Sequence, residues 1–167
     1  MSVSMHSMSH AVFKRGLTQL LHVMDKAAAN AKARNFDVSV LFGARLAPDM
    51  LPLSRQVQLT SDFAKNSMAR LAAVDPPKFE DTEATWDDLV ARVKKTLDYI
   101  DTVPASALEG SETRHIKITL RDRTVEFPGL EFLQIWALPN FFFHHVTVYD
   151  LLRHNGVDLG KRDFLGS

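Results

Sequence analysis

The chain has 167 residues, and its 20 Lys and Arg residues balance 20 Asp and Glu residues, so the formal net charge is zero. This balance lacks the clustered positive charge that binds nucleic acids and anionic membranes, and we expect neither as a partner. The absence of cysteine excludes disulfides, thiolate catalysis and cysteine-ligated zinc. Zero net charge also does little to keep copies apart, which leaves room for self-association.

The chain has the length of one domain with its own core, and we treat residues 1–167 as that domain. The first residues lack the basic region and apolar run of a signal peptide. No window approaches the roughly 20 apolar residues that cross a bilayer. We therefore expect a cytoplasmic protein.

A first helix is expected from about Ser4 to Asn35, where apolar residues recur at steps of mostly three and four. A connection of crossover length follows. A second helix starts near Pro48 or at Pro52 and runs to Ala73, and the prolines after it stop it, because a residue before proline avoids the α region.

A third helix starts at Asp81 or Thr82, where a capping residue precedes a crowd of acidic side chains, and it ends at Pro104. The segment His115–Phe127 alternates apolar and polar residues on both sides of a short polar turn. This pattern predicts a small β-hairpin.

The segment Gly129–Gly156 is the most apolar long stretch and predicts the last helix, which Pro139 should kink or split. In the tail, Leu159, Phe164 and Leu165 are expected to fold back onto the helices. Four long helices with a hairpin before the last predict an all-α four-helix bundle.

The last helix places Asn140, His144 and Thr147 on one face. A histidine in so apolar a segment needs a partner or stays neutral. His144 is then either a neutral core residue bonded to a carbonyl or to a side chain such as Gln56, or a metal ligand or general base. His145 points about 100° away and cannot share one site with His144.

The aromatic run at positions 141–143 covers nearly every side of this helix. A helix that is apolar all round is central in a core or faces a second subunit. With zero net charge, we expect a homodimer that packs through this helix or its neighbour.

Two segments carry a family resemblance: ALPNFFFHHVTVYDLLRHNGVDLGKRDFLG and, upstream, LPLSRQVQLTSDFAKNSMARLA. The chain resembles an uncharacterised branch of the DinB-like superfamily, composed of bacterial domains of unknown function. The resemblance implies an up-down-down-up four-helix bundle that often dimerises through its helices.

Better-studied members of that superfamily hold a divalent metal such as nickel or zinc with three histidines, and several are transferases or hydrolases. Carried over by position, His144 matches the second histidine of the pair in the last helix, and the first falls on Asn140. The ligand of the second helix has no histidine to match, and Gln56 or Asp62 lies nearest.

The leading hypothesis is therefore a small polar pocket formed by Gln56, Asn140 and His144 that binds a small molecule or serves a scaffold, with no resident cofactor. The alternative is a metal-dependent transferase or hydrolase in which His144 is a metal ligand. Its further ligands would be recruited from elsewhere: His22, Asp62, or the N-terminal histidines His6 and His10.

Overall fold

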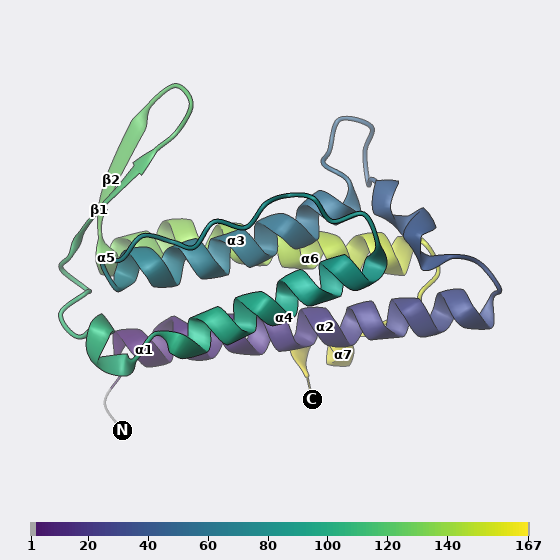
Figure 1. Ribbon diagram of the computed structural model, residues 1–167, viewed down its shortest axis with the longest axis horizontal. Helices are drawn as coiled ribbons and strands as arrows, with labels where there is room; N and C mark the ends of the chain where they lie inside the picture. Colours follow the sequence, from purple (N-terminus) through teal and green to yellow (C-terminus); the bar gives the residue numbers. More distant parts are fainter. Residues whose placement is uncertain (1–2, 167) are drawn as a thin grey trace.

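The computed structural model describes residues 3–166, which are mostly helical and carry one two-stranded antiparallel sheet. Four long helices run along the molecule (Figure 1): α2 (His10–Ala33), α3 (Leu53–Leu71), α4 (Trp86–Thr102) and α6 (Leu138–His154). The shorter elements are α1 (Met5–Met8), the 3₁₀ helices η1 (Val38–Gly43) and η2 (Ala105–Leu108), α5 (Gly129–Glu131) and α7 (Lys161–Leu165). The predicted all-α fold with a small hairpin is confirmed.

The long connection that crosses the molecule lies between α3 and α4. In Figure 1, α2 and α6 start at the end where the hairpin projects, whereas α3 and α4 start at the opposite end. Residues 72–85 therefore run back along the length of the molecule before α4 begins. The sequence placed its crossover-length connection after the first helix, but that segment reverses the chain and folds as η1, whose Leu41 is buried.

The expected first helix is divided at Ser9. The Ser9 hydroxyl donates a hydrogen bond to the Met5 carbonyl, one turn earlier, at 2.6 Å, and the backbone there departs from helical geometry. The main-chain N–H of Ser9 bonds to the same carbonyl at 2.9 Å, and a serine hydroxyl that bonds back in this way often bends a helix. Ser9 separates α1 from α2.

Helix α3 is the central element of the fold. It packs against both α4 and α6, and none of its 19 residues is exposed. Its buried face includes Leu53, Val57, Ala64, Met68 and Leu71. Polar side chains on α3 are consequently held at helix–helix contacts, where they need partners.

Pro139 does not split the last helix. It is the second residue of α6, and the preceding residues Phe132–Ala137 form a π-helical segment that continues from α5. A wider π turn removes the main-chain bond that the proline ring would obstruct in a regular helix. The helix therefore passes the proline and carries its residues on to the α3 interface.

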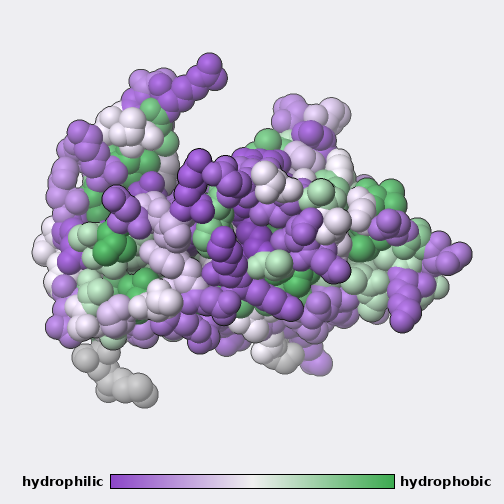
Figure 2. Space-filling model, in the orientation of Figure 1, coloured by the Kyte–Doolittle hydropathy of each residue, from purple (hydrophilic) through white to green (hydrophobic). Residues whose placement is uncertain are grey.

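The hairpin pairs β1 (His115–Thr119) with β2 (Thr124–Pro128), as the alternation predicted, with Ile116 opposite Phe127. Ile116 and Ile118 are buried against the helices, whereas the side chains between them face outward. In the view of Figure 2, hydrophobic residues gather beneath the hairpin and over η1, and the surface between is largely hydrophilic. Within residues 3–166, no helix has both the length and the apolar character needed to cross a bilayer.

Candidate functional site around His144

His144 lies at the contact between α6 and α3, where it meets Gln56. Its Nδ1 atom is 2.7 Å from the Gln56 Oε1 atom, and both side chains are buried. These two helices run side by side, and the pair is a polar contact within their interface. The structure thus brings together two of the three residues that the sequence assigned to a polar pocket.

The direction of this hydrogen bond follows from the second bond of Gln56. The Gln56 Nε2 amide donates to the Leu51 carbonyl at 3.1 Å, so the Oε1 atom is the one that faces His144. An oxygen acceptor requires a proton on Nδ1 of the imidazole. In the neutral ring, Nε2 then carries the lone pair, which can accept a hydrogen bond or bind a metal.

Burial lowers the pKa of His144 below its ordinary value. The Phe63 ring stacks on the imidazole with centroids 5.5 Å apart, and the Phe143 ring meets it edge-on at 5.2 Å. These apolar faces disfavour the charged form. His144 is consequently a neutral, oriented imidazole with a small exposed fraction of 9%.

Asn140 and Thr147 share the helix face of His144, but their hydrogen-bond donors point back to the main chain. The Asn140 amide donates to the Trp136 carbonyl at 2.7 Å, and the Thr147 hydroxyl donates to the Phe143 carbonyl at 2.7 Å. Asn140 therefore borders the site with its own donor already engaged.

The residues present do not fit a three-histidine metal centre. Asn140 supplies an amide beside His144, and the Gln56 oxygen is already the acceptor for His144. Asp62, the other residue nearest to the expected ligand of the second helix, pairs with Arg92 instead. Within residues 3–166, no group of three or more His, Asp or Glu side chains is placed to hold a metal ion.

The residues that could have been recruited as further ligands are engaged elsewhere. His22 pairs with Asp163 at 3.0 Å, and His10 pairs with Asp101 at 2.8 Å. His6 stacks on His10 with ring centroids 4.5 Å apart. Asp62 pairs with Arg92 of α4 at 2.9 Å. None of these residues has a recorded bond to His144.

Arg92 of α4 has a role that the sequence did not reveal. Its side chain is 2% exposed, and its guanidinium contacts Asp62 at 2.9 Å, Glu83 at 2.8 Å and Asp81 at 3.1 Å. The amide of Gln58 also donates to Glu83. Asp81 and Glu83 belong to the crossing segment, so Arg92 fastens that segment to α3 and α4, and we assign it a structural role.

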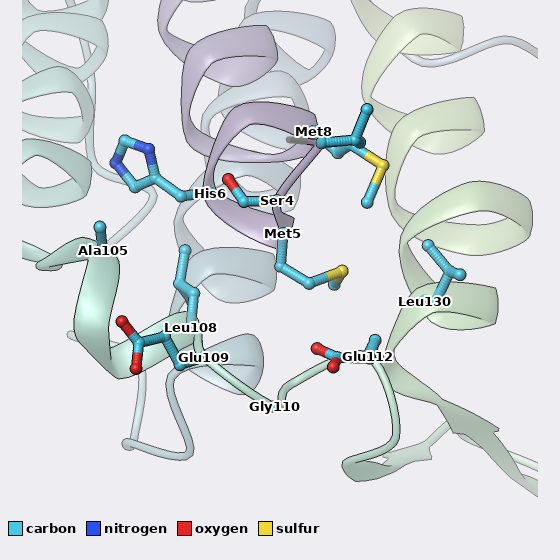
Figure 3. Close-up of a pocket in the computed structure, with 11 residues that line it drawn as sticks. Ser4, Met5, His6, Met8, Ala105, Leu108, Glu109, Gly110, Glu112 and Leu130 are labelled. Atoms are coloured by element: carbon cyan, nitrogen blue, oxygen red, sulfur yellow. The ribbon is translucent and has the colours of Figure 1, made fainter. Parts of the chain in front are cut away.

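A hollow of about 510 Å³ lies at the end of the molecule near the hairpin. Its lining includes Met5, Met8, Leu108 and Leu130, with Glu109 and Glu112 as its acidic residues. In Figure 3 the imidazole of His6 points away from the two methionine side chains. No buried, unpaired polar side chain lines this hollow. It therefore offers less for specific recognition than the oriented imidazole of His144.

Comparison with known proteins agrees with this fold. The structure is similar to a crystal structure of a DinB family member protein from Shewanella denitrificans, with a TM-score of 0.90 and 36% sequence identity, over 97% of this chain and 92% of that chain. No curated protein matches the chain. The model of the family described as Domain of unknown function (DUF1993) matches residues 5–165. The chain therefore belongs to the DUF1993 family and is a DinB-like domain of unknown function.

Proposed function

We propose that this domain binds a small molecule at a pocket formed by Gln56, Asn140 and His144, with His144 Nε2 as the recognising atom. The observation that carries the proposal is the hydrogen bond between Gln56 Oε1 and His144 Nδ1. It fixes the tautomer and leaves Nε2 as the acceptor. Oriented, partly buried histidines of this kind recur where a protein must present one defined nitrogen.

The surroundings of His144 define the chemical class of the ligand. A neutral imidazole with a lone pair on Nε2 requires a ligand that donates an N–H or O–H bond. The ring of Phe63, stacked on His144, favours an apolar or aromatic body beside that donor. The ligand class is therefore a small uncharged molecule with one hydrogen-bond donor on an apolar frame.

Benzamide and acetophenone test this ligand class, because they are similar in size but only benzamide has N–H donors. We expect benzamide to shift the ¹⁵N resonance of His144 Nε2 in a saturable manner and acetophenone to do so at least about threefold more weakly. In calorimetric titrations, His144→Phe should bind benzamide no better than acetophenone, whereas His154→Phe, at the exposed end of α6, should retain the preference for benzamide. Equal binding of both probes by the wild-type protein would contradict the proposal.

We also propose that the protein is cytoplasmic and needs no resident metal, with nickel or zinc at His144 as the competing possibility. The amide of Asn140 at one expected ligand position, and the amide of Gln56 as the α3 partner of His144, support the metal-free site. A divalent metal would favour the transferase or hydrolase class instead, and elemental analysis separates the two.

A homodimer is a further part of the proposal, with the scaffold role as its consequence. Ile135, Pro139, Phe143 and Val146 follow one another at steps of three or four along the last helical segment and are all exposed; we call them the α6 stripe. A second copy that covers this stripe would remove its apolar surface from water. The directions of the four long helices in Figure 1 support an up-down-down-up bundle, the form expected from the resemblance.

A further inference from the structure

The imidazole of His144 reaches the surface of the chain through one nitrogen. Within residues 3–166 its Nε2 atom has no hydrogen-bond partner, yet it is not sealed from solvent. Both ring nitrogens of the neighbouring His145, in contrast, are sealed and unpaired. Nε2 of His144 is therefore the accessible nitrogen of this histidine pair, and a ligand approaches it from the surface, at the junction of α3 and α6.

A single chain supplies walls on only part of this approach. The Phe63 ring of α3 stacks on the imidazole at 5.5 Å, and the Phe143 ring of α6 meets its edge at 5.2 Å. Sites that bind small molecules specifically cover roughly 70–90% of the ligand surface. A molecule bonded to Nε2 would rest on α3 and α6 and keep its outer side in water. The site is therefore incomplete in one chain.

The α6 stripe runs beside this opening. Phe143 belongs to both features, because its ring contacts His144 and is 58% exposed. Asn140 and His144 each follow a stripe residue by one position, about 100° around the helix. Packed helices have axes about 8–10 Å apart, and each helix is about 10 Å wide with its side chains. A helix that packs on the stripe therefore reaches the outer side of the His144 site.

The charges along this helix favour a second copy of the chain as the partner. A two-fold contact brings the same surface of both copies together, so an uncharged stripe pairs with itself without repulsion. Glu131, Asp150 and Arg153 are exposed near its two ends. Parallel helices would place each of these charges opposite its own copy. Antiparallel helices bring Glu131 toward the partner's Arg153, which carries the opposite charge.

We propose that a second copy of the chain completes the His144 site: two α6 helices pack antiparallel along the α6 stripe, and the partner's Phe143 covers the ligand bound at Nε2. A two-fold axis between Pro139 and Phe143 places the partner's Phe143 beside Pro139, next to Asn140. The inference rests on the proposed function, and the ligand is the same small uncharged molecule with one donor. Its apolar body packs against the partner's ring. Ligand binding and dimerisation therefore strengthen each other.

The coupling is tested with a variant of the stripe that lies away from His144. Benzamide is titrated into the wild type, Ile135→Glu and Val40→Glu while the ¹⁵N resonance of His144 Nε2 is followed. We expect Ile135→Glu, as a monomer, to bind benzamide about threefold to tenfold more weakly, and Val40→Glu on exposed η1 to match the wild type. Saturating benzamide should lower the dimer dissociation constant of the wild type by about the same factor per site.

A mixing experiment tests whether the partner supplies the ring. Phe143→Ala protein, ¹⁵N-labelled, is mixed with an equal amount of unlabelled His144→Phe protein, which keeps Phe143 but lacks the imidazole. In the mixed dimer the labelled chain still lacks its own Phe143 but gains the partner's Phe143. About half of the labelled His144 should then bind benzamide more tightly than in Phe143→Ala alone. Mixing with unlabelled Phe143→Ala protein is the control and should change nothing.

The outcomes separate this inference from the proposed function. If monomeric Ile135→Glu binds benzamide as tightly as the dimeric wild type, the inference is wrong and the site is complete in one chain. If the mixed dimers show no gain, the partner does not contribute its ring. A monomeric wild type would overturn the inference and leave the stripe to a different protein. A dimeric wild type that does not bind benzamide would contradict the proposed function itself. If His144→Phe does not fold, Ile135→Glu against Val40→Glu still decides.

Discussion

The Gln56 Oε1 atom accepts a hydrogen bond from His144 Nδ1 over 2.7 Å and joins α3 to α6 inside the protein. Because the same glutamine donates to the Leu51 carbonyl, the amide cannot reverse without losing both bonds. The contact therefore determines which imidazole nitrogen is protonated. This single fact gives His144 its acceptor nitrogen and links the fold to the proposed ligand class.

Replacing Gln56 by alanine should release that tautomer. The buried Nδ1–H of His144 would lose its acceptor, so we expect a loss of about 1 to 2 kcal/mol in the free energy of unfolding. Urea denaturation measures this loss, and ¹⁵N spectra of His144 should show an increased population of the Nε2–H form. Gln134→Ala, at an exposed position before α6, should change neither quantity. Unaltered spectra in Gln56→Ala would show that the contact does not set the tautomer.

The buried histidines predict a loss of stability in mild acid. The pKa of His145 is lowered from 6.5 in the unfolded chain to about 4 in the folded protein, and burial lowers that of His144 in the same direction. As the pH falls, the unfolded chain therefore binds protons first. Stability from His145 is complete above pH 6.5 and declines as the pH approaches about 4, by about 3 kcal/mol in total.

Urea denaturation at pH 7.5 and pH 4.5 measures this decline, and the matched variant is His145→Phe, which has no titrating group at this position. The difference in unfolding free energy between the two pH values should be smaller in the variant than in the wild type. Equal differences would show that His145 is protonated in the folded protein without penalty, and the assignment of a neutral buried ring would be wrong.

Removal of Arg92 should be strongly destabilising. Arg92→Ala leaves Asp62 and Glu83 without the guanidinium that neutralises them, and breaking a buried ion pair in this way costs about 3 to 5 kcal/mol. The comparison is Arg55→Ala, because Arg55 and Asp81 form a more exposed pair, with side chains 37% and 40% exposed, that should contribute less than about 1 kcal/mol. Chemical denaturation of both proteins provides the measurement. Similar small effects would mean that the crossing segment does not depend on Arg92.

The α6 stripe is the predicted contact between two copies. Ile135 is 55% exposed, and a charge at this position would oppose burial in an interface. Ile135→Glu should therefore shift the protein from dimer to monomer in size-exclusion chromatography with light scattering. Val40→Glu, at an exposed position on η1, should leave the mass unchanged. A monomer mass for the wild-type protein would refute the dimer.

The long helices and the hairpin could be predicted because each carries a clear period in its own sequence. The interruptions of the helices were harder to predict. At Ser9, where α1 ends, the hydroxyl bonds to the Met5 carbonyl. Pro139 follows a π-helical segment that no local sequence pattern predicts. Residues 72–85 cross the molecule because α4 starts at the same end as α3, and the direction of a helix depends on tertiary packing.

In the candidate site, too, features set by helical spacing could be predicted, whereas features set by tertiary contacts could not. The shared face of Asn140 and His144 follows from helical spacing, and Gln56 was named as a partner for His144; the structure contains that contact. The return of Phe164 to the helices was expected, but its contact with the His145 ring could not be foreseen, since it depends on where α7 lies in the tertiary structure. The setting of Arg92 likewise depends on carboxylates of the crossing segment.

Elemental analysis of the purified, untagged protein, with His144→Ala beside it, tests the central claim most directly. A double variant, Gln56→His with Asn140→His, serves as the positive control, because it places one imidazole at the position that the DinB-like resemblance matches to Asn140 and another at Gln56, the α3 residue that contacts His144. The account predicts no stoichiometric metal in the wild type or in His144→Ala, and about one nickel or zinc ion per chain in the double variant. About one metal ion per chain in the wild type, lost in His144→Ala, would contradict the metal-free ligand site and restore the enzyme interpretation.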